Sequence, residues 1–176
     1  MTARISRRTL FGHLRGGGEQ QRPPWSRPDE AFTDSCTLCG DCLTACPTGV
    51  LVKGHGGYPI VDFGKSHCSF CGACRDACRA DCFIAGASGK DVPPWNLKAV
   101  IGASCMETAG VTCRVCEGAC ETSAIRFRPR LGGGSSPSIS SKDCTGCGAC
   151  VGACPVRAIE ITDRVQVHPQ QLEAVT

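Results

Sequence analysis

The sequence predicts an α+β fold of two similar small modules that are held together by bound metal more than by a large apolar core. Three observations lead to this prediction. The 176-residue chain contains 17 cysteines, and only 5% of its residues are aromatic. The cysteines fall into four compact groups, and short β-prone runs beside glycine lie between them. Because such a chain buries little apolar surface, packing alone cannot offset the entropy lost on ordering.

Cysteines at this density belong either to the disulfide scaffold of an exported protein or to a metal protein in a reducing compartment. Compact, repeated groups favour metal. The segment Ser6-Arg7-Arg8 is similar to a twin-arginine export signal, but residues 12–19 lack the apolar run that such a signal needs. We therefore expect a cytoplasmic protein whose cysteines are reduced and bind metal.

Three of the four groups share the spacing C-x2-C-x2-C-x3-C, which bacterial ferredoxins use to bind [4Fe–4S] clusters. The two-residue gaps wrap a loop around one corner of a cluster, and the three-residue gap sends the fourth cysteine to the neighbouring cluster. The third group widens its first gap and keeps the other two. The predicted ligands are Cys36, Cys39, Cys42, Cys46, Cys68, Cys71, Cys74, Cys78, Cys105, Cys113, Cys116, Cys120, Cys144, Cys147, Cys150 and Cys154.

Zinc is the alternative metal for these groups. A structural zinc site usually takes two C-x2-C pairs that are set apart along the chain, and runs of four cysteines suit it poorly. We therefore predict four [4Fe–4S] clusters in two tandem modules of the bacterial ferredoxin-like type, with short hairpins, short helices and an extended N-terminal tail.

The pairing of the groups follows from the segments between them. Hairpins predicted within residues 50–61 and 125–140 join the first group to the second and the third to the fourth. A nested pairing, of the first group with the fourth and the second with the third, is the competing arrangement. The expected ligand sets are Cys36, Cys39, Cys42 and Cys78; Cys68, Cys71, Cys74 and Cys46; Cys105, Cys113, Cys116 and Cys154; and Cys144, Cys147, Cys150 and Cys120.

Cys82 lies outside these sets. The sequence favours a small buried apolar side chain at this position, as for most free cysteines. The alternative is a spare ligand for a labile cluster, four residues after Cys78. The chain has no phosphate loop, dinucleotide fingerprint or nucleophile elbow, and its histidines lack metal or nucleophile spacing, so we do not expect an enzyme.

The composition divides the chain into five parts. These are a basic tail or docking arm at residues 1–30, the first module at 31–85, a linker at 86–98, the second module at 99–168 and a C-terminal tail at 169–176.

Residues 1–28 hold six arginines and one acidic residue, a net charge of +5, whereas the whole chain carries +3. This charge, together with Leu10, Phe11 and Trp25, predicts an arm for transient docking; a tail without a role is the alternative. Each oxidised cluster with its four thiolates adds a charge of about −2, so the body is acidic and offers no surface for nucleic acid. No apolar run is long enough to span a membrane.

Several short motifs accompany the cysteine groups. They are Ser6-Arg7-Arg8, Arg22-Pro23-Pro24-Trp25-Ser26, Gly56-Gly57-Tyr58-Pro59, Cys68-Ser69-Phe70-Cys71 and Phe127-Arg128-Pro129. With these motifs and the wide third group, nearly the whole chain resembles the NapF family of ferredoxin-type accessory proteins. Arg79 stands where that family is expected to have proline, which affects only local geometry.

The resemblance implies a cytoplasmic protein that binds the catalytic subunit of the periplasmic nitrate reductase as an apo precursor. It also implies that the protein assists the maturation of that subunit's [4Fe–4S] cluster before export. The competing hypothesis is a general polyferredoxin that carries electrons in a respiratory chain. The basic tail and the Pro-Trp segment favour the first hypothesis, because a plain carrier needs no docking arm.

Overall fold

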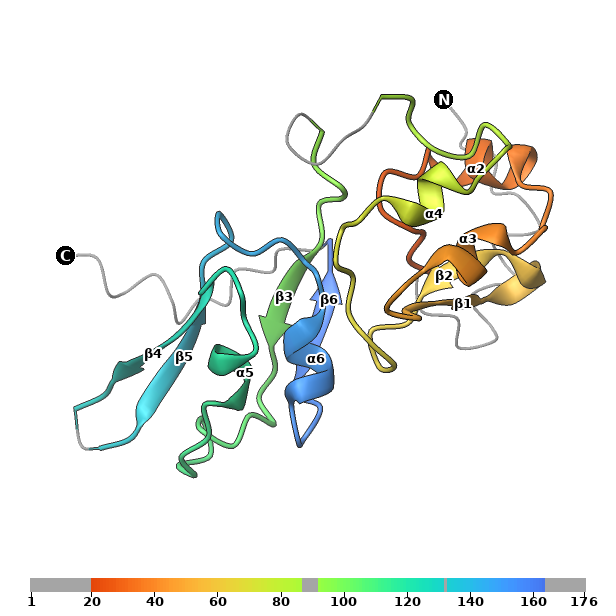
Figure 1. Ribbon diagram of the computed structural model, residues 1–176. Coiled ribbons are helices and arrows are strands. Elements are labelled where there is room, and N and C mark those ends of the chain that lie inside the picture. Colours follow the sequence, from red (N-terminus) through yellow and green to blue (C-terminus); the bar gives the residue numbers. More distant parts are fainter. Residues whose placement is uncertain (1–19, 87–91, 132, 164–176) are drawn as a thin grey trace, which may run out of the picture.

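The structure of the protein is a computed structural model that describes residues 20–86, 92–131 and 133–163. Two small modules of short helices and two-stranded sheets lie next to each other (Figure 1). The expected helix in residues 4–15 and the C-terminal tail fall outside the described residues. Within the described part of the chain, no helix is long and apolar enough to cross a membrane.

The first module carries one cysteine group on each side of a hairpin. Strands β1 (Leu51–Lys53) and β2 (Pro59–Val61) pair antiparallel, and a short 3-10 helix, η1 (His55–Gly57), joins them. Helices α3 (Asp41–Ala45) and α4 (Ala73–Asp76) each hold the third cysteine of a group. This hairpin confirms the prediction for the first module.

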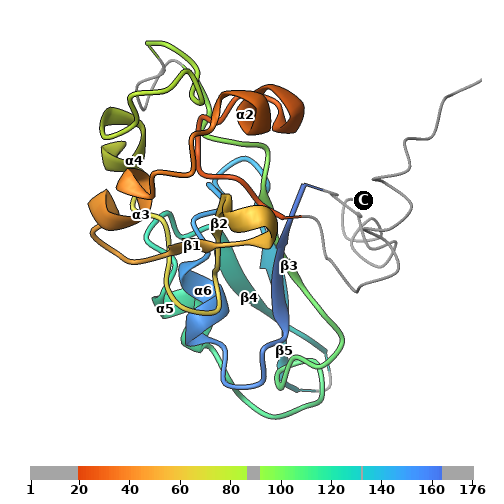
Figure 2. The same ribbon diagram turned by 90° about the vertical axis from the view of Figure 1, so that its right-hand side faces the viewer.

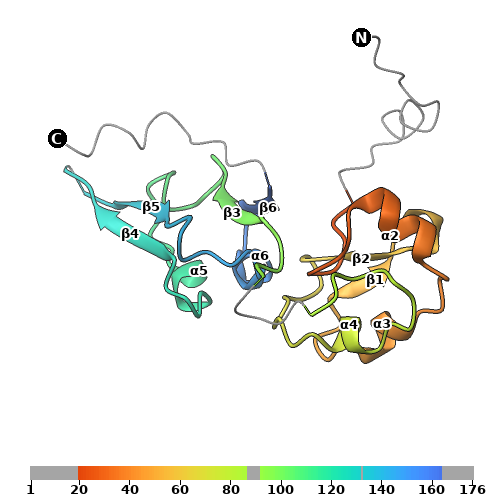
Figure 3. The same ribbon diagram turned by 90° about the horizontal axis from the view of Figure 1, so that it is seen from above.

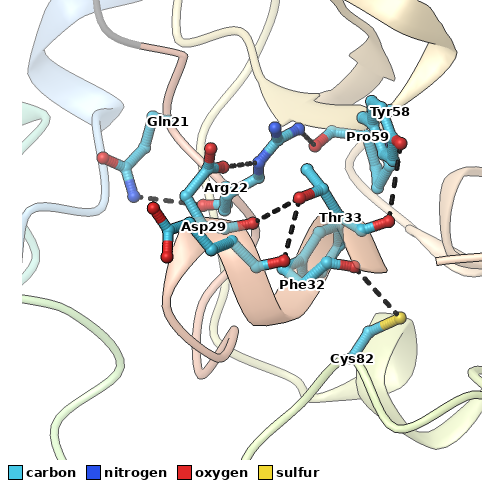
Figure 4. Close-up of polar contacts among 9 residues, drawn as sticks. Gln21, Arg22, Asp29, Phe32, Thr33, Tyr58, Pro59 and Cys82 are labelled. Carbon is cyan, nitrogen blue, oxygen red and sulfur yellow. Dashed lines mark hydrogen bonds and ion pairs between the residues drawn. The ribbon is translucent and has the colours of Figure 1, made fainter. Parts of the chain in front are cut away.

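A further helix, α2 (Asp29–Ser35), precedes the first cysteine group and buries Phe32. It lies at the end of the first module that is remote from the hairpin formed by residues 125–139 of the second module (Figures 1 and 2). Arg22 ties the segment before α2 to this helix and to the hairpin. Its guanidinium lies 2.6 Å from the Asp29 carboxylate, donates to the Pro59 carbonyl, and stacks on Phe32 and Tyr58 (Figure 4).

The second module repeats this order with longer strands. Strands β4 (Ile125–Pro129) and β5 (Ser135–Ile139) form its hairpin, as predicted. Helices α5 (Val115–Gly118) and α6 (Ala149–Ala153) carry the third cysteines of their groups.

The second module also contains a sheet that the sequence did not predict. Strand β3 (Lys98–Ile101) pairs antiparallel with β6 (Ile159–Thr162), so the two ends of the module meet. Because the two strands are far apart in the sequence, the local patterns of neither strand indicate this partner. Lys98, assigned to the linker above, is the first residue of β3.

The two ends of the first module also meet, but a single bridge joins them in place of a ladder. Ser26 and Phe83 form an isolated antiparallel bridge. Next to it, the Arg27 N–H donates to the Cys82 carbonyl at 3.0 Å. In the second module, the Gly102 N–H donates to the Ala158 carbonyl at 2.7 Å. The segment around Ser26 is therefore the first strand-like element of the first module.

The structure corrects the extent of the N-terminal arm. The side chain of Trp25 is only 2% exposed. Its Nε1 donates to the Val92 carbonyl and its N–H to the Pro94 carbonyl. Trp25 is thus part of the core rather than a docking residue, and residues 92–94 pack on the first module instead of forming a free linker.

The cysteines are part of both small cores. The first core contains Phe32, Val50, Leu51, Val61, Cys68, Cys74, Cys82 and Phe83. The second contains Ala99, Cys116, Ala124, Ile125, Phe127, Cys144, Cys150 and Ile159. In each module the predicted ligands thus pack directly against the few large apolar side chains.

The second and fourth cysteine groups meet where the modules touch. The Cys68 N–H donates to the Cys147 carbonyl at 2.9 Å, and Trp95 Nε1 donates to the Thr145 carbonyl at 3.0 Å. The Phe63 ring packs edge-on against Trp95. It also lies so close to Gly148 that a Cβ at this position would clash with it. Seen from above, α6 lies on the side of the second module that faces the first (Figure 3).

Candidate metal centres

The loops of groups one, two and four share an unusual backbone. The residue before each short helix is a glycine in the left-handed region: Gly40, Gly72 and Gly148, with φ of 82°, 78° and 82°. The residue before the second cysteine is left-handed too, at Leu38, Phe70 and Gly146. Two such reversals curl the chain tightly, so that successive cysteines of a group lie around one point.

The third group reaches a similar end by another route. Arg114, with φ of −130°, stands where the other groups have glycine. The buried carboxylate of Glu107 accepts the Cys113 N–H at 2.7 Å and the hydroxyl of Ser135. These two donors hold the pKa of Glu107 below its ordinary value. The sequence alone did not single out Glu107. The one available signal was an acidic residue in a loop whose backbone N–H groups need acceptors.

Two of the four expected sets each line a cavity. Cys36, Cys39, Cys42 and Cys78 line the first cavity, together with Cys82. The corresponding cavity of the second module is lined by Cys105, Cys113, Cys116 and Cys154. The structure therefore brings the last cysteine of the second group to the first group, and that of the fourth group to the third.

The other two sets each contribute a cysteine, Cys68 and Cys147, to the contact between the modules. Burial raises the pKa of Cys68 to about 11, and the neighbouring charges of Cys46, Cys71 and Cys147 add to this. Cys46 is thus among the thiols of the second group, as the reciprocal pairing requires. In the second module, Cys120 packs on the same apolar cluster as Cys144 and Cys150.

Burial and mutual repulsion disfavour thiolates at several positions. The pKa of Cys42, Cys74 and Cys116 rises to about 11, and that of Cys150 to about 12, in each case with burial as the main cause. Without metal these groups are thiols. Binding of a cluster would therefore release protons, because the ligand is the thiolate.

Two fourth cysteines lie in the opposite environment. The hydroxyl of Thr48 lies 3.5 Å from the Cys46 sulfur, and that of Thr122 lies 3.6 Å from the Cys120 sulfur. Burial raises the pKa of both thiols, but these hydroxyls and nearby backbone N–H groups outweigh it and lower the pKa below its ordinary value. Such donors stabilise negative charge on sulfur and tune the reduction potential of a bound cluster.

The donor sets fit iron–sulfur clusters. Among the described residues, no three His, Cys, Asp or Glu side chains are close enough together to hold one metal ion. The cysteines of the first and third groups surround a cavity instead. A cluster suits this arrangement because each thiolate binds a different iron.

Comparison with known proteins identifies the class. Residues 35–83 and 111–158 each match the model of a 4Fe-4S dicluster domain. Two such domains in one chain define a ferredoxin-type iron–sulfur protein of the polyferredoxin kind.

The relatives identify the family. The chain is 46% identical over 145 residues to the ferredoxin-type protein NapF of Haemophilus influenzae, which covers 82% of this chain and 80% of the relative. It is 42% identical over 150 residues to the protein of the same name from Escherichia coli K12, covering 85% and 89%. The chain therefore belongs to the NapF family of ferredoxin-type proteins.

More distant relatives have other roles in their names. The chain is 39% identical to one subunit of an ion-translocating oxidoreductase complex of Methanosarcina acetivorans, over 73% of this chain and 47% of the relative. It is 30% identical to the methylamine utilization ferredoxin-type protein MauM of Methylorubrum extorquens, over 76% and 67%.

Proposed function

We propose that this chain is a cytoplasmic accessory protein with four [4Fe–4S] clusters on its sixteen grouped cysteines. In this proposal it binds the catalytic subunit of the periplasmic nitrate reductase before export and assists the maturation of that subunit's cluster. Membership of the NapF family supports the proposal, since the resemblance described above implies this role.

The observation that carries the proposal is the exposure of the first module's cysteine loops. Cys39 and Cys71 are exposed, whereas every cysteine of the second module is buried or intermediate. Leu38, next to Cys39, is 46% exposed. A factor that hands a cluster or electrons to a partner needs ligands at the contact surface, and an exposed apolar side chain beside them favours transient docking.

The case for an N-terminal arm is narrower than the sequence predicted. Trp25 is buried, so the Pro-Trp segment no longer supports docking. The remaining arm is residues 1–19, which carry four arginines and one acid. This charge supports electrostatic steering that salt screens over about 8 Å at physiological ionic strength.

Transfer to the partner tests the proposal. Protein loaded with radioactive iron is mixed with the apo precursor of the reductase, and the iron bound to the re-isolated precursor is counted. We expect Leu38→Asp to reduce both binding and transfer several-fold. Val115→Asp, which changes an exposed apolar side chain of the second module, is the matched control and should leave both unchanged. Equal transfer by the two variants, or no transfer by the unaltered protein, would contradict the proposal.

The alternative function is electron transfer in a respiratory chain. The contact between Cys68 and Cys147 favours it, because it places the second and fourth groups side by side. Electrons entering at the first group would then pass to the second, fourth and third groups in that order. If the partner is reduced and gains no radioactive iron, the chain is an electron carrier.

A further inference from the structure

The cavity of the first cysteine group has a fifth thiol. Cys82 lines it with Cys36, Cys39, Cys42 and Cys78. Its side chain is only 1% exposed, and its sulfur lies 4.0 Å from the Phe32 carbonyl, toward which it points in Figure 4. The thiols of Cys78 and Cys36 lie close enough to interact with it electrostatically. Cys82 is therefore both a core residue and a member of the candidate metal centre.

The second module has alanine at the equivalent position. Ala158 follows Cys154 by four residues, as Cys82 follows Cys78. Both residues are buried, and both accept the equivalent backbone hydrogen bond, from Gly102 and Arg27 respectively. Ala158 also lines the cavity of the third group. The two modules thus differ by one thiol at matched positions.

The chain after Cys78 departs from the other three groups. Three residues after the fourth cysteine, the other groups have a left-handed residue whose N–H donates to that cysteine's carbonyl. These residues are Gly49, Ser123 and Arg157, at φ of 66°, 52° and 50°. After Cys78 the turn closes differently, since the Cys82 N–H donates to the Ala80 carbonyl at 2.9 Å. This turn spans residues 80–82, and Arg79, where the first and fourth groups have proline, comes directly before it.

The different turn changes what the fourth sulfur meets. Cys154 Sγ accepts the Ala158 N–H at 3.2 Å, and Cys46 and Cys120 have threonine hydroxyls beside their sulfurs. The Cys78 thiol instead donates to the Ala80 carbonyl at 3.3 Å. The Cys78 sulfur therefore has a carbonyl oxygen as its hydrogen-bond partner, where the sulfurs of the other three fourth cysteines have an N–H or a hydroxyl.

We propose that Cys82 is a reserve ligand that takes the place of Cys78 in the first metal centre. The Cys82 proton moves to the Cys78 sulfur as Cys78 leaves its iron. One iron–sulfur bond forms and one breaks, and neither the oxidation state nor the total charge changes. Cys36, Cys39 and Cys42 continue to hold the cluster during the exchange. The inference rests on the iron–sulfur class of the protein and does not depend on its partner.

Matched alanine variants of the full-length chain test the proposal. After anaerobic purification, iron and sulfide per chain are counted and the EPR spectrum is recorded. We expect Cys78→Ala to keep the full iron content, because Cys82 replaces the lost ligand. Cys154→Ala, the equivalent change in the second module, should lose one cluster's worth of iron.

Two double variants isolate the role of the fifth thiol. Cys78→Ala with Cys82→Ala should lose the cluster that Cys78→Ala alone retains. Cys154→Ala with Ala158→Cys should recover the cluster of the second module. Loss of the cluster in Cys78→Ala alone, or its retention in the first double variant, would overturn the proposal.

A kinetic measurement covers the case in which Cys78→Ala does not fold. The unaltered protein and Cys82→Ala, which reproduces the side chain at Ala158, are compared for the rate of iron release to a chelator. We expect one quarter of the iron to leave several-fold faster from Cys82→Ala, because a cluster that loses Cys78 then has no replacement ligand. Identical release curves would contradict the proposal.

Discussion

The two modules contain the same arrangement of cysteines and hold it with different interactions. In the second module, two ladders, β3–β6 and β4–β5, join the segments around the cysteines. The first module has a shorter hairpin and one isolated bridge. It compensates with aromatic contacts: Trp25 packs edge-on with Phe70, and Phe32 with Phe83.

This difference shows which parts of the fold the ligands fix and which they leave free. Both modules keep the short helices and the hairpin, and groups one, two and four keep the left-handed glycine, because each of these brings thiolates to their cluster. The remaining stabilisation comes from backbone ladders in one module and aromatic packing in the other. The accessibility and ligand choice of each centre can therefore diverge while the modules remain alike.

Removal of the clusters should have the largest effect, because it removes what both modules share. We expect chelation under anaerobic conditions to abolish the far-UV circular dichroism of helices and strands together, since the apolar cores are small and include the cysteines. Hydrogen exchange then compares how much protection the backbone amides of each module lose. Native circular dichroism in the fully apo protein would show that the cores alone suffice.

Exchange of single ligands tests whether both modules pair their groups reciprocally. Cys46→Ser should damage the cluster of Cys68, Cys71 and Cys74 more than that of its own group. Cys154→Ser should likewise damage the centre of the third group. EPR with iron counts distinguishes the clusters. If each substitution damages its own group instead, the reciprocal pairing is wrong; damage by Cys46→Ser to the fourth group and by Cys154→Ser to the first would support the nested pairing.

Trp25→Ala tests the aromatic support of the first module. Truncation of a large buried aromatic side chain costs about 3–5 kcal/mol, and it also removes the contact of the Arg75 guanidinium with the Trp25 ring. We expect the thermal midpoint for loss of iron–sulfur absorbance to fall for the first module and to be nearly unchanged for the second. Trp25→Phe should be much milder. An unchanged thermal midpoint for Trp25→Ala would contradict a structural role for this side chain and would support its assignment to the docking arm.

Gly148→Ala tests the contact between the modules. A Cβ here would overlap the Phe63 ring, whereas at Gly40, which has the same φ of 82°, it would meet nothing within 4 Å. Gly148→Ala and the control Gly40→Ala carry the same backbone strain. The difference between their free energies of unfolding therefore measures the clash, which we expect to cost about 1–3 kcal/mol. Faster hydrogen exchange at the Cys68 N–H should accompany it. Equal melting of the two variants would mean that Phe63 does not hold the interface.

The threonine hydroxyls should have the smallest effect. Thr48→Val and Thr122→Val each remove a donor to a ligand sulfur. Since a hydrogen bond is worth about 0.5–1.5 kcal/mol, we expect one cluster in each variant to fall by about 20–60 mV in reduction potential. Thr→Ser at either site, which keeps the hydroxyl, is the control. A redox titration followed by EPR measures the shift, and an unchanged potential in the valine variants would exclude this role.

Much of the fold was predictable because the cysteine spacing and the hairpin patterns are local. The runs around Leu51 and Ile125 became β1 and β4 as expected. The β3–β6 sheet was missed because its strands lie at opposite ends of the module. Trp25 was misassigned because the sequence around it is basic and rich in proline, while its burial depends on Val92 and Pro94.

The sequence by itself determined the class of metal centre, the predicted ligands and the duplication of the module, since cluster ligation is encoded in short, fixed spacings. The tertiary structure decided what surrounds those ligands. It placed Cys82 in the cavity of the first group, Glu107 beneath the wide loop of the third, and Cys68 against Cys147 between the modules. Except for the local bond between Glu107 and Cys113, these contacts join residues that are distant in the sequence, so their partners are fixed only when the chain has folded.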